Sequence, residues 1–201
     1  MELIYIIDTS GSMYSNRIAA VNAVLTECVS VIRNHIKRYD TEVSVRYMTF
    51  NDSVSELYHI GDVQNDGFPD FEVKASGDFY PLTRFETMYE GIIGCLADRP
   101  GGDLGIILIT DGKPVDSLNY QGKLEKAKSL DQFRNAVRLV ACVERDPLVS
   151  DQDLLEFVGF KADRIVELSR LPIETEHLIS AFTDEKTCGS GPENDFISVF
   201  D

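Results

Sequence analysis

The stretch that decides the fold is ELIYIIDTSGS, residues 2–12, in which a nearly continuous apolar run ends in a polar loop. Such a run is typical of a parallel strand buried between two layers of helices. The loop places one carboxylate and two hydroxyls at alternate positions, Asp8, Ser10 and Ser12, around Gly11. The segment therefore predicts a core strand that delivers several oxygen atoms to one edge of a sheet.

The rest of the chain alternates predicted helices with predicted strands. Apolar residues at three-and-four spacing predict amphipathic helices, and apolar or alternating runs predict strands. We expect helices at 18–36, 87–96, 124–135, 154–158 and 174–182, and strands at 41–50, 55–60, 104–110, 137–143 and 164–168. This order predicts an α/β fold of the doubly wound, Rossmann-like type, with a mainly parallel sheet and helices on both faces.

Length and composition fit one globular domain. The 201 residues suffice for a single full core, and we expect a domain over residues 1–182 and a flexible tail over 183–201. The segment 61–82 has no readable pattern. The four cysteines are widely spaced without a CxxC pair, so free thiols are expected.

Charge and hydropathy exclude several classes of partner. The net charge of −15, from 34 acidic and 19 basic residues, repels nucleic acid. No apolar run approaches the roughly 20 residues that span a bilayer, so no membrane contact is expected. The first apolar stretch lacks the basic region of a signal peptide, which predicts a cytoplasmic protein.

A second polar loop follows the other strongly apolar strand. Asp111 comes directly after the run Ile106–Thr110 and before Gly112. In doubly wound sheets, ligands bind outside the carboxyl ends of the strands, where these two loops would lie. Carboxylate and hydroxyl oxygens suit Mg²⁺, which prefers six oxygen ligands and keeps several waters. Too few protein charges surround such an ion to saturate it, which leaves a position open for an external carboxylate.

These motifs together resemble the von Willebrand factor A (VWA) family. Asp8, Ser10 and Ser12 match its DxSxS signature, and Thr110-Asp111-Gly112 resembles its later TDG loop. The segment 50–52, Phe-Asn-Asp, is similar to the strand exit of the family. The resemblance covers about residues 1–182.

The resemblance implies a metal-ion-dependent adhesion site (MIDAS), in which Asp8, Ser10, Ser12 and Asp111 approach Mg²⁺, with Mn²⁺ or Ca²⁺ as alternatives. The family adds a threonine from a Gly-x-Thr motif, and this sequence departs from that motif. Counting back from Gly91 lands on Glu86, so Thr87 is favoured as the ligand and Thr83 is the second choice. Glu86 in the metal shell would hold the ion more tightly and weaken its pull on a ligand.

The predicted function is a non-enzymatic, Mg²⁺-dependent adaptor that binds an Asp or Glu of a protein partner. Size and layout resemble the small intracellular bacterial type linked to tellurite resistance. One alternative is a degenerate domain that binds a partner without metal. Another is an Asp-nucleophile phosphotransferase, in which a second aspartate normally follows the nucleophile by two residues, where this chain has Ser10. A third interpretation is purely structural: Ser10 or Ser15 caps the next helix, and residues 110–112 form only a turn.

Overall fold

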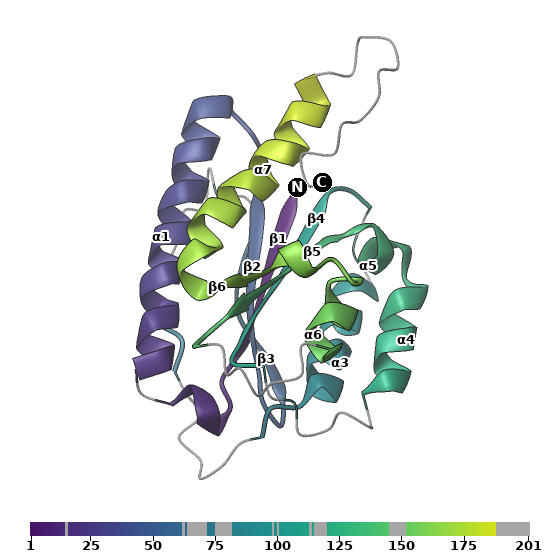
Figure 1. Cartoon of the computed structure of the whole chain (residues 1–201). Coiled ribbons are helices and arrows are strands. Elements are labelled where there is room, and N and C mark those ends of the chain that lie inside the picture. Colours follow the sequence, from purple (N-terminus) through teal and green to yellow (C-terminus); the bar gives the residue numbers. More distant parts are fainter. Residues whose placement is uncertain are drawn as a thin grey trace.

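Six strands form one sheet in the order β3-β2-β1-β4-β5-β6 (Figure 1). The structure is a computed structural model that describes residues 1–14, 16–61, 63, 72–74, 82–97, 99, 101–112, 114, 120–144 and 152–187. Most of the unreadable segment 61–82, and residues 188–201 of the expected tail, lie outside the described residues.

The sheet is parallel except at one edge. The parallel strands are β1 (Glu2–Asp8), β2 (Ser44–Phe50), β4 (Leu104–Thr110), β5 (Val137–Cys142) and β6 (Ile165–Glu167), and β3 (Val54–Ile60) pairs antiparallel with β2. This arrangement confirms the predicted doubly wound fold. In the register of the sheet, Ile7 lies beside Thr49 on one side and Ile109 on the other. The ends of β1, β2 and β4 therefore meet at one edge.

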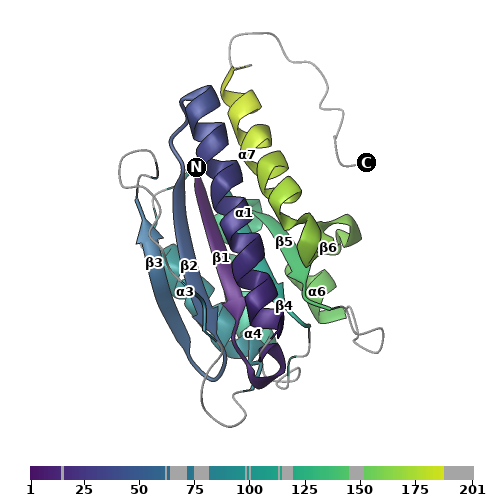
Figure 2. The same cartoon turned by 90° about the vertical axis from the view of Figure 1, so that its left-hand side faces the viewer.

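Helices cover both faces of the sheet (Figures 1 and 2). One face carries α1 (Asn16–Tyr39) and α7 (Leu171–Thr187), and the other carries α3 (Phe85–Ala97), α4 (Gln121–Ser129), α5 (Asp131–Asn135) and α6 (Gln152–Phe157). Short 3-10 segments are η1 (Gly11–Met13), η2 (Ala162–Arg164) and η3 (Leu168–Arg170). Successive residues of β1 alternate between the two helical layers, which explains its continuous apolar run.

Two helices differ from the sequence prediction. The single helix expected at 124–135 is divided into α4 and α5, because Leu130 between them has an extended backbone (φ −82°, ψ 126°). Its side chain still packs against the core, so the apolar spacing continues through the break. The last helix, expected at 174–182, begins at Leu171 and continues to Thr187.

A close approach fixes the position of α3 against the sheet. A Cβ atom added to Gly91 would lie 2.6 Å from Cγ2 of Val54 and 3.2 Å from Cε of Met48. Glycine therefore lets α3 lie directly on β2 and β3, and this contact sets the start of α3 near the carboxyl edge of the sheet.

Two further properties concern the thiols and the helices. Cys28, Cys95 and Cys142 are free, as predicted, and Cys188 lies outside the described residues. None of the helices in the described part of the chain is long and apolar enough to cross a membrane.

Candidate metal centre

Asp8, the last residue of β1, forms the buried floor of the site. Its side chain is fully buried, and both carboxylate oxygens accept hydrogen bonds from neutral donors. The backbone N–H of Ser10 donates to Oδ1 at 2.8 Å, and the hydroxyl of Thr110 donates to Oδ2 at 2.7 Å. These contacts hold the carboxylate in one orientation between the exits of β1 and β4.

The charge of Asp8 is poorly compensated by these contacts. Burial raises the pKa of Asp8 from its ordinary value near 3.8 to about 6, and the nearby charge of Asp111 adds to the rise. The hydrogen bonds from Ser10 and Thr110 lower the pKa but do not offset the desolvation. An anion in such a place gains stability from any cation that binds beside it.

The loop after β4 explains the sequence Thr-Asp-Gly. The hydroxyl of Thr110 donates to Asp8 and accepts a hydrogen bond of 3.0 Å from the N–H of Gly112. Gly112 has φ 87°, a left-handed conformation that favours glycine. The turn leaves Asp111 buried, and its Oδ1 has no hydrogen-bond partner among the residues that the structure describes. A buried carboxylate oxygen without a donor is costly and indicates a place for a ligand.

Three hydroxyls form a row beside these carboxylates. Thr83 donates to Oγ of Ser10 at 2.7 Å, and Oγ of Ser10 lies 3.1 Å from Oγ of Ser12. Ser10 and Thr83 are buried, whereas Ser12 is exposed to solvent. The hydroxyl of Ser10 makes no capping bond to η1, which argues against the purely structural interpretation of this serine. Ser15 lies outside the described residues.

Thr83 reaches the row because Asp52 anchors the chain on both sides of it. Oδ2 of Asp52 accepts a hydrogen bond of 3.4 Å from the N–H of Leu82, and Oδ1 accepts one of 2.7 Å from Nε of Arg84. Asp52 follows the end of β2, so the exit of this strand positions the threonine. The structure thus brings together Asp8, Ser10, Ser12 and Asp111, the four residues that the resemblance implied, and with them Thr83, the second choice for the threonine.

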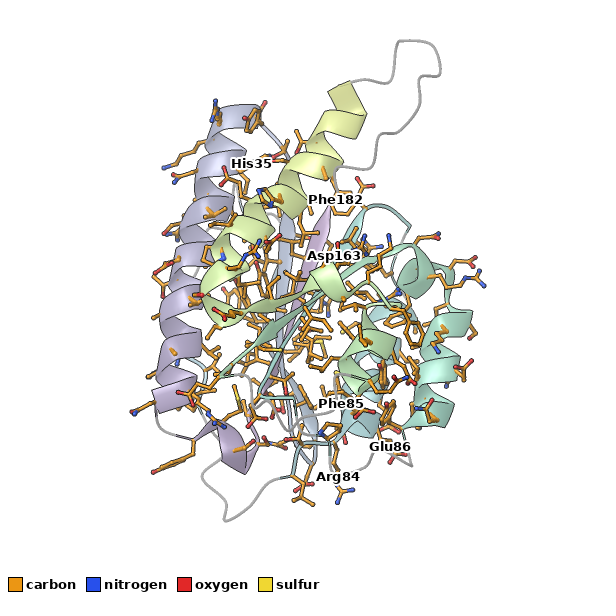
Figure 3. The ribbon with its side chains drawn as sticks, viewed as in Figure 1. His35, Arg84, Phe85, Glu86, Asp163 and Phe182 are labelled. Carbon is orange, nitrogen blue, oxygen red and sulfur yellow. The ribbon has the colours of Figure 1, made fainter. Side chains whose placement is uncertain are left out.

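The favoured threonine of the sequence analysis lies elsewhere. Thr87 is half-buried in the first turn of α3. Glu86, next to it, lies toward α4 (Figure 3). There the pKa of Lys123 is raised by a hydrogen bond from the lysine to Glu90 and, to a smaller extent, by the charge of Glu86. The geometry favours Thr83 over Thr87 as the threonine of the site, and Thr87 as a ligand stays a prediction.

A pair of valine substitutions separates the two threonines. Valine keeps the shape of threonine and removes only the hydroxyl. We expect Thr83→Val to weaken Mn²⁺ binding roughly tenfold, because it removes an oxygen from the row. We expect Thr87→Val to leave the dissociation constant within about twofold of the wild type. Titration calorimetry with Mn²⁺ measures both constants, and a larger effect of Thr87→Val would reverse the assignment.

Arg17 is a further member of the site that the sequence analysis missed. Its Nη1 donates to Oδ2 of Asp111 at 2.9 Å and to the backbone carbonyl of Ser12 at 3.0 Å. Its Nε donates to Glu144 at 2.9 Å, just after β5. An arginine five positions after Ser12, directly before the helix predicted at 18–36, was the available signal.

The donor set fits a hard divalent cation. Two carboxylates and three hydroxyls are all oxygen donors, the type that Mg²⁺, Mn²⁺ and Ca²⁺ prefer. The described residues contain no group of three or more His, Cys, Asp or Glu side chains that could hold a metal. An ion at this site would therefore depend on hydroxyls and water as well as on Asp8 and Asp111. The unpartnered Oδ1 of Asp111 supports this fit.

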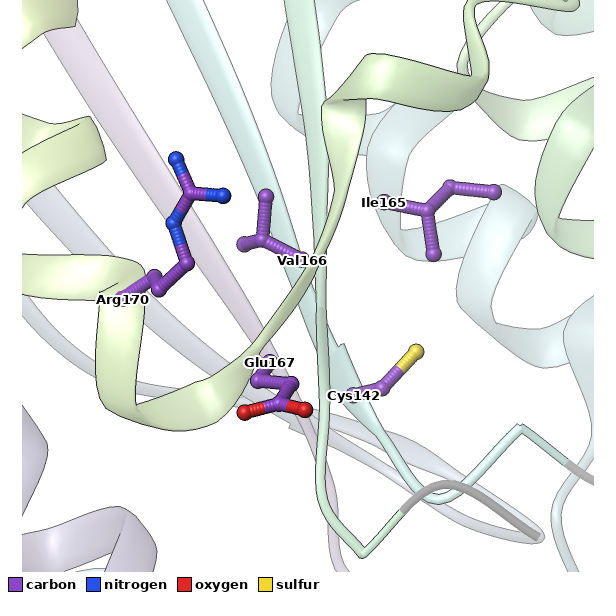
Figure 4. Close-up of a pocket in the computed structure, with 5 residues that line it drawn as sticks. All are labelled: Cys142, Ile165, Val166, Glu167 and Arg170. Carbon is purple, nitrogen blue, oxygen red and sulfur yellow. The ribbon is translucent and has the colours of Figure 1, made fainter.

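A pocket lies beside β6 (Figure 4). Its lining residues are Cys142, Ile165, Val166, Glu167 and Arg170. It offers one carboxylate and one guanidinium but no row of hydroxyls. The chemistry suited to a metal is therefore concentrated at the exits of β1 and β4.

Comparison with known proteins supports the fold. No family model and no curated protein matches the sequence. Among solved structures, BatB from Bacteroides thetaiotaomicron, a conserved hypothetical protein, has a TM-score of 0.64 at 15% identity, covering 92% of this chain and 99% of that one. The ArnB paralog VWA2 from Sulfolobus acidocaldarius has a TM-score of 0.59 at 19% identity, over 86% of this chain and 43% of that one.

A third neighbour carries a metal at a MIDAS motif. Proximal thread matrix protein 1 from the mussel byssus, solved with a zinc-occupied MIDAS motif, has a TM-score of 0.58 at 13% identity. The match covers 90% of this chain and 45% of that protein. The chain therefore spans less than half of this neighbour and of VWA2. At these identities the likeness establishes the fold.

Proposed function

We propose that this chain, which has a von Willebrand factor A-type fold, is a protein-binding module whose metal centre binds an acidic side chain of a partner. The observation that carries the proposal is the buried Oδ1 of Asp111, which no described residue contacts by a hydrogen bond. It occurs beside a fixed carboxylate at Asp8 and a row of three hydroxyls. The zinc-occupied MIDAS motif of the mussel protein supports the idea that this fold can hold a divalent ion.

The residues that would hold the ion are Asp8, Ser10, Ser12, Thr83 and Asp111. Mg²⁺ is the proposed ion, with Mn²⁺ and Ca²⁺ as alternatives, because these ions share the preference for oxygen. A bound divalent ion would supply a Lewis-acidic position for a carboxylate oxygen of a partner. Ser12 is the exposed end of the hydroxyl row, so this end is accessible to a partner.

The proposal is a binding role and not catalysis. Both oxygens of Asp8 accept hydrogen bonds from Ser10 and Thr110, which suits a structural anion better than a nucleophile. A role as a cytoplasmic adaptor, and a likeness to the tellurite-resistance type, stay predictions from the sequence.

One observation favours the metal-free alternative. Arg17 already provides a cation for Oδ2 of Asp111, at 2.9 Å. A module that used this guanidinium in place of an ion would bind its partner equally well in the presence of a chelator. The two candidates therefore differ in a measurable way.

The first test is calorimetric titration of the chelator-treated protein with Mg²⁺ and Mn²⁺. We expect saturable binding of one ion per chain. Peptides should then be selected from a random displayed library in Mn²⁺ and eluted with EDTA, with a parallel selection in EDTA as the control. Enrichment of Asp or Glu only in the Mn²⁺ arm would support the proposal. Absence of ion binding at millimolar concentrations, with equal peptide binding in both arms, would contradict it and favour the metal-free module.

A further inference from the structure

Arg17 connects three loops at the carboxyl edge of the sheet. Its guanidinium contacts the carbonyl of Ser12 after β1, the carboxylate of Asp111 after β4 and that of Glu144 after β5. The arginine side chain is 30% exposed, that of Asp111 only 5%, and that of Glu144 67%. The contact with Asp111 is therefore the sheltered one, and the contact with Glu144 faces solvent.

The two oxygens of Asp111 have different environments. Oδ2 accepts a hydrogen bond from Arg17, while Oδ1 is buried without a partner in the described part of the chain. Any cation bound through Oδ1 would share one carboxylate with the guanidinium. The guanidinium and the ion would repel each other, and each would interact with only part of the negative charge of Asp111. Because Asp111 is sheltered from water, solvent screens this repulsion weakly.

The balance of charge in the site has a consequence for the partner. The negative charges of Asp8 and Asp111 equal the charge of one divalent ion. Arg17 adds a positive charge, and apart from Asp111 its ion-pair partner among the described residues is the exposed Glu144. The loaded site would therefore retain positive character, which favours an incoming carboxylate.

We infer that Arg17 is a positioning residue that weakens ion binding while it strengthens the hold of the loaded site on a partner carboxylate. The inference rests on the proposed function, since it requires that an ion binds through Asp111. Arg17 holds Asp111 through Oδ2, so Oδ1 is the oxygen that would be left for an ion, and the guanidinium would compete with that ion for the negative charge of the carboxylate. Glu144 opposes Arg17 by neutralising part of its charge.

The test uses two substitutions that should act in opposite directions. Arg17→Gln removes the positive charge, and we expect it to lower the dissociation constant for Mn²⁺ roughly fivefold. Glu144→Gln leaves Arg17 with less compensation, and we expect it to raise that constant about twofold. Arg17→Lys keeps the charge but not the fork of donors, so it is the control for charge alone, and if charge dominates we expect the constant within about twofold of the wild type. Titration calorimetry with Mn²⁺ gives all four constants.

A second measurement reports the binding of an external carboxylate to the ion-loaded site. Water-proton relaxation reports water on protein-bound Mn²⁺, and sodium acetate serves as the carboxylate probe. We expect the Arg17→Gln protein to need about fivefold more acetate than the wild type to lower the relaxation enhancement by half. A merely structural role of Arg17 would not strengthen ion binding and weaken acetate binding together.

The possible outcomes separate this inference from the proposed function. If the wild type binds no Mn²⁺, the proposed function fails and the inference fails with it. If the wild type binds Mn²⁺ and Arg17→Gln binds it equally or more weakly, only the inference is overturned. The same holds if Arg17→Gln and Glu144→Gln shift the constant in one direction. Urea denaturation in EDTA confirms that each variant is folded, and Glu144→Gln, at an exposed position, provides a test even if Arg17→Gln does not fold.

Discussion

Asp8→Asn is expected to abolish ion binding and, in the metal-free protein, to increase stability at neutral pH. Asparagine has nearly the same shape but no charge, so the site loses the anion that is compensated only by neutral donors among its described contacts. We expect the affinity for Mn²⁺ to fall at least about 100-fold. The gain in stability follows from removing a buried charge.

The size of this gain depends on pH. The folded-state pKa of Asp8 is about 6, above its ordinary value of 3.8, so the folded protein binds the proton more tightly than the unfolded chain. Above about pH 6, the ionised carboxylate of Asp8 lowers the free energy of unfolding by its full amount. This loss of stability becomes smaller as the pH falls from about 6 toward about 4. At pH 7.5 we expect Asp8→Asn to raise the free energy of unfolding by about 1–2 kcal/mol, after some loss at the Thr110 contact.

Urea denaturation in EDTA at pH 7.5 and at pH 4.5 measures this effect. The difference between the variant and the wild type should shrink at the lower pH, because Asp8 is then protonated in the folded wild type. Other titrating groups change the stability of the variant and of the wild type equally, so the difference between the two proteins reports the titration of Asp8. A variant that is less stable than the wild type at pH 7.5 would show that the hydrogen bonds of the carboxylate outweigh its desolvation.

Asp111→Asn makes the same chemical change with the opposite effect on stability. Asp111 is paired with Arg17, and its removal breaks a partly buried ion pair and places an amide group in a site without a partner for one atom. We expect the free energy of unfolding in EDTA to fall by about 1–2 kcal/mol at pH 7.5. Binding of Mn²⁺ should again weaken at least about 100-fold, because the negative charge of the carboxylate is lost.

Asp131→Asn is the matched control for both substitutions. Asp131 is exposed at the start of α5, where its carboxylate pairs with Arg134 on the surface. This substitution removes the same charge, so we expect stability within about 0.5 kcal/mol and unchanged ion binding. Equal behaviour of Asp8→Asn and Asp111→Asn in EDTA would contradict the different environments of the two carboxylates.

The fold was largely predictable because the parallel strands are buried on both faces. β1 and β4 are nearly continuous apolar runs, a pattern typical of strands that are buried on both faces. The sequence also indicated where they end, at Asp8 and Thr110. The division between α4 and α5 was not predictable, since Leu130 keeps the apolar spacing while its backbone is extended. Periodicity reports burial and not backbone conformation.

The site was predictable only where its residues follow strands. Asp8 and Asp111 occupy strand exits, so sequence position alone places them at one edge. Thr83 depends on the anchor that Asp52 provides from a distant part of the chain, and counting residues from Gly91 favoured Thr87 instead. Arg17 was missed although it follows Ser12 by five positions, because a basic residue beside a predicted helix usually contacts only solvent.

The metal centre joins parts of the chain that are far apart, since Ser10 and Thr83 are 73 positions from each other and Asp8 and Thr110 are 102 apart. Because such contacts require the intervening crossovers, we expect them to contribute little in the folding transition state, which φ-values at Thr83 and Thr110 would measure. Stability gained at this centre would slow unfolding and leave the folding rate nearly unchanged. The centre would therefore lengthen the lifetime of the folded sheet, because its contacts form late in folding and must break early in unfolding.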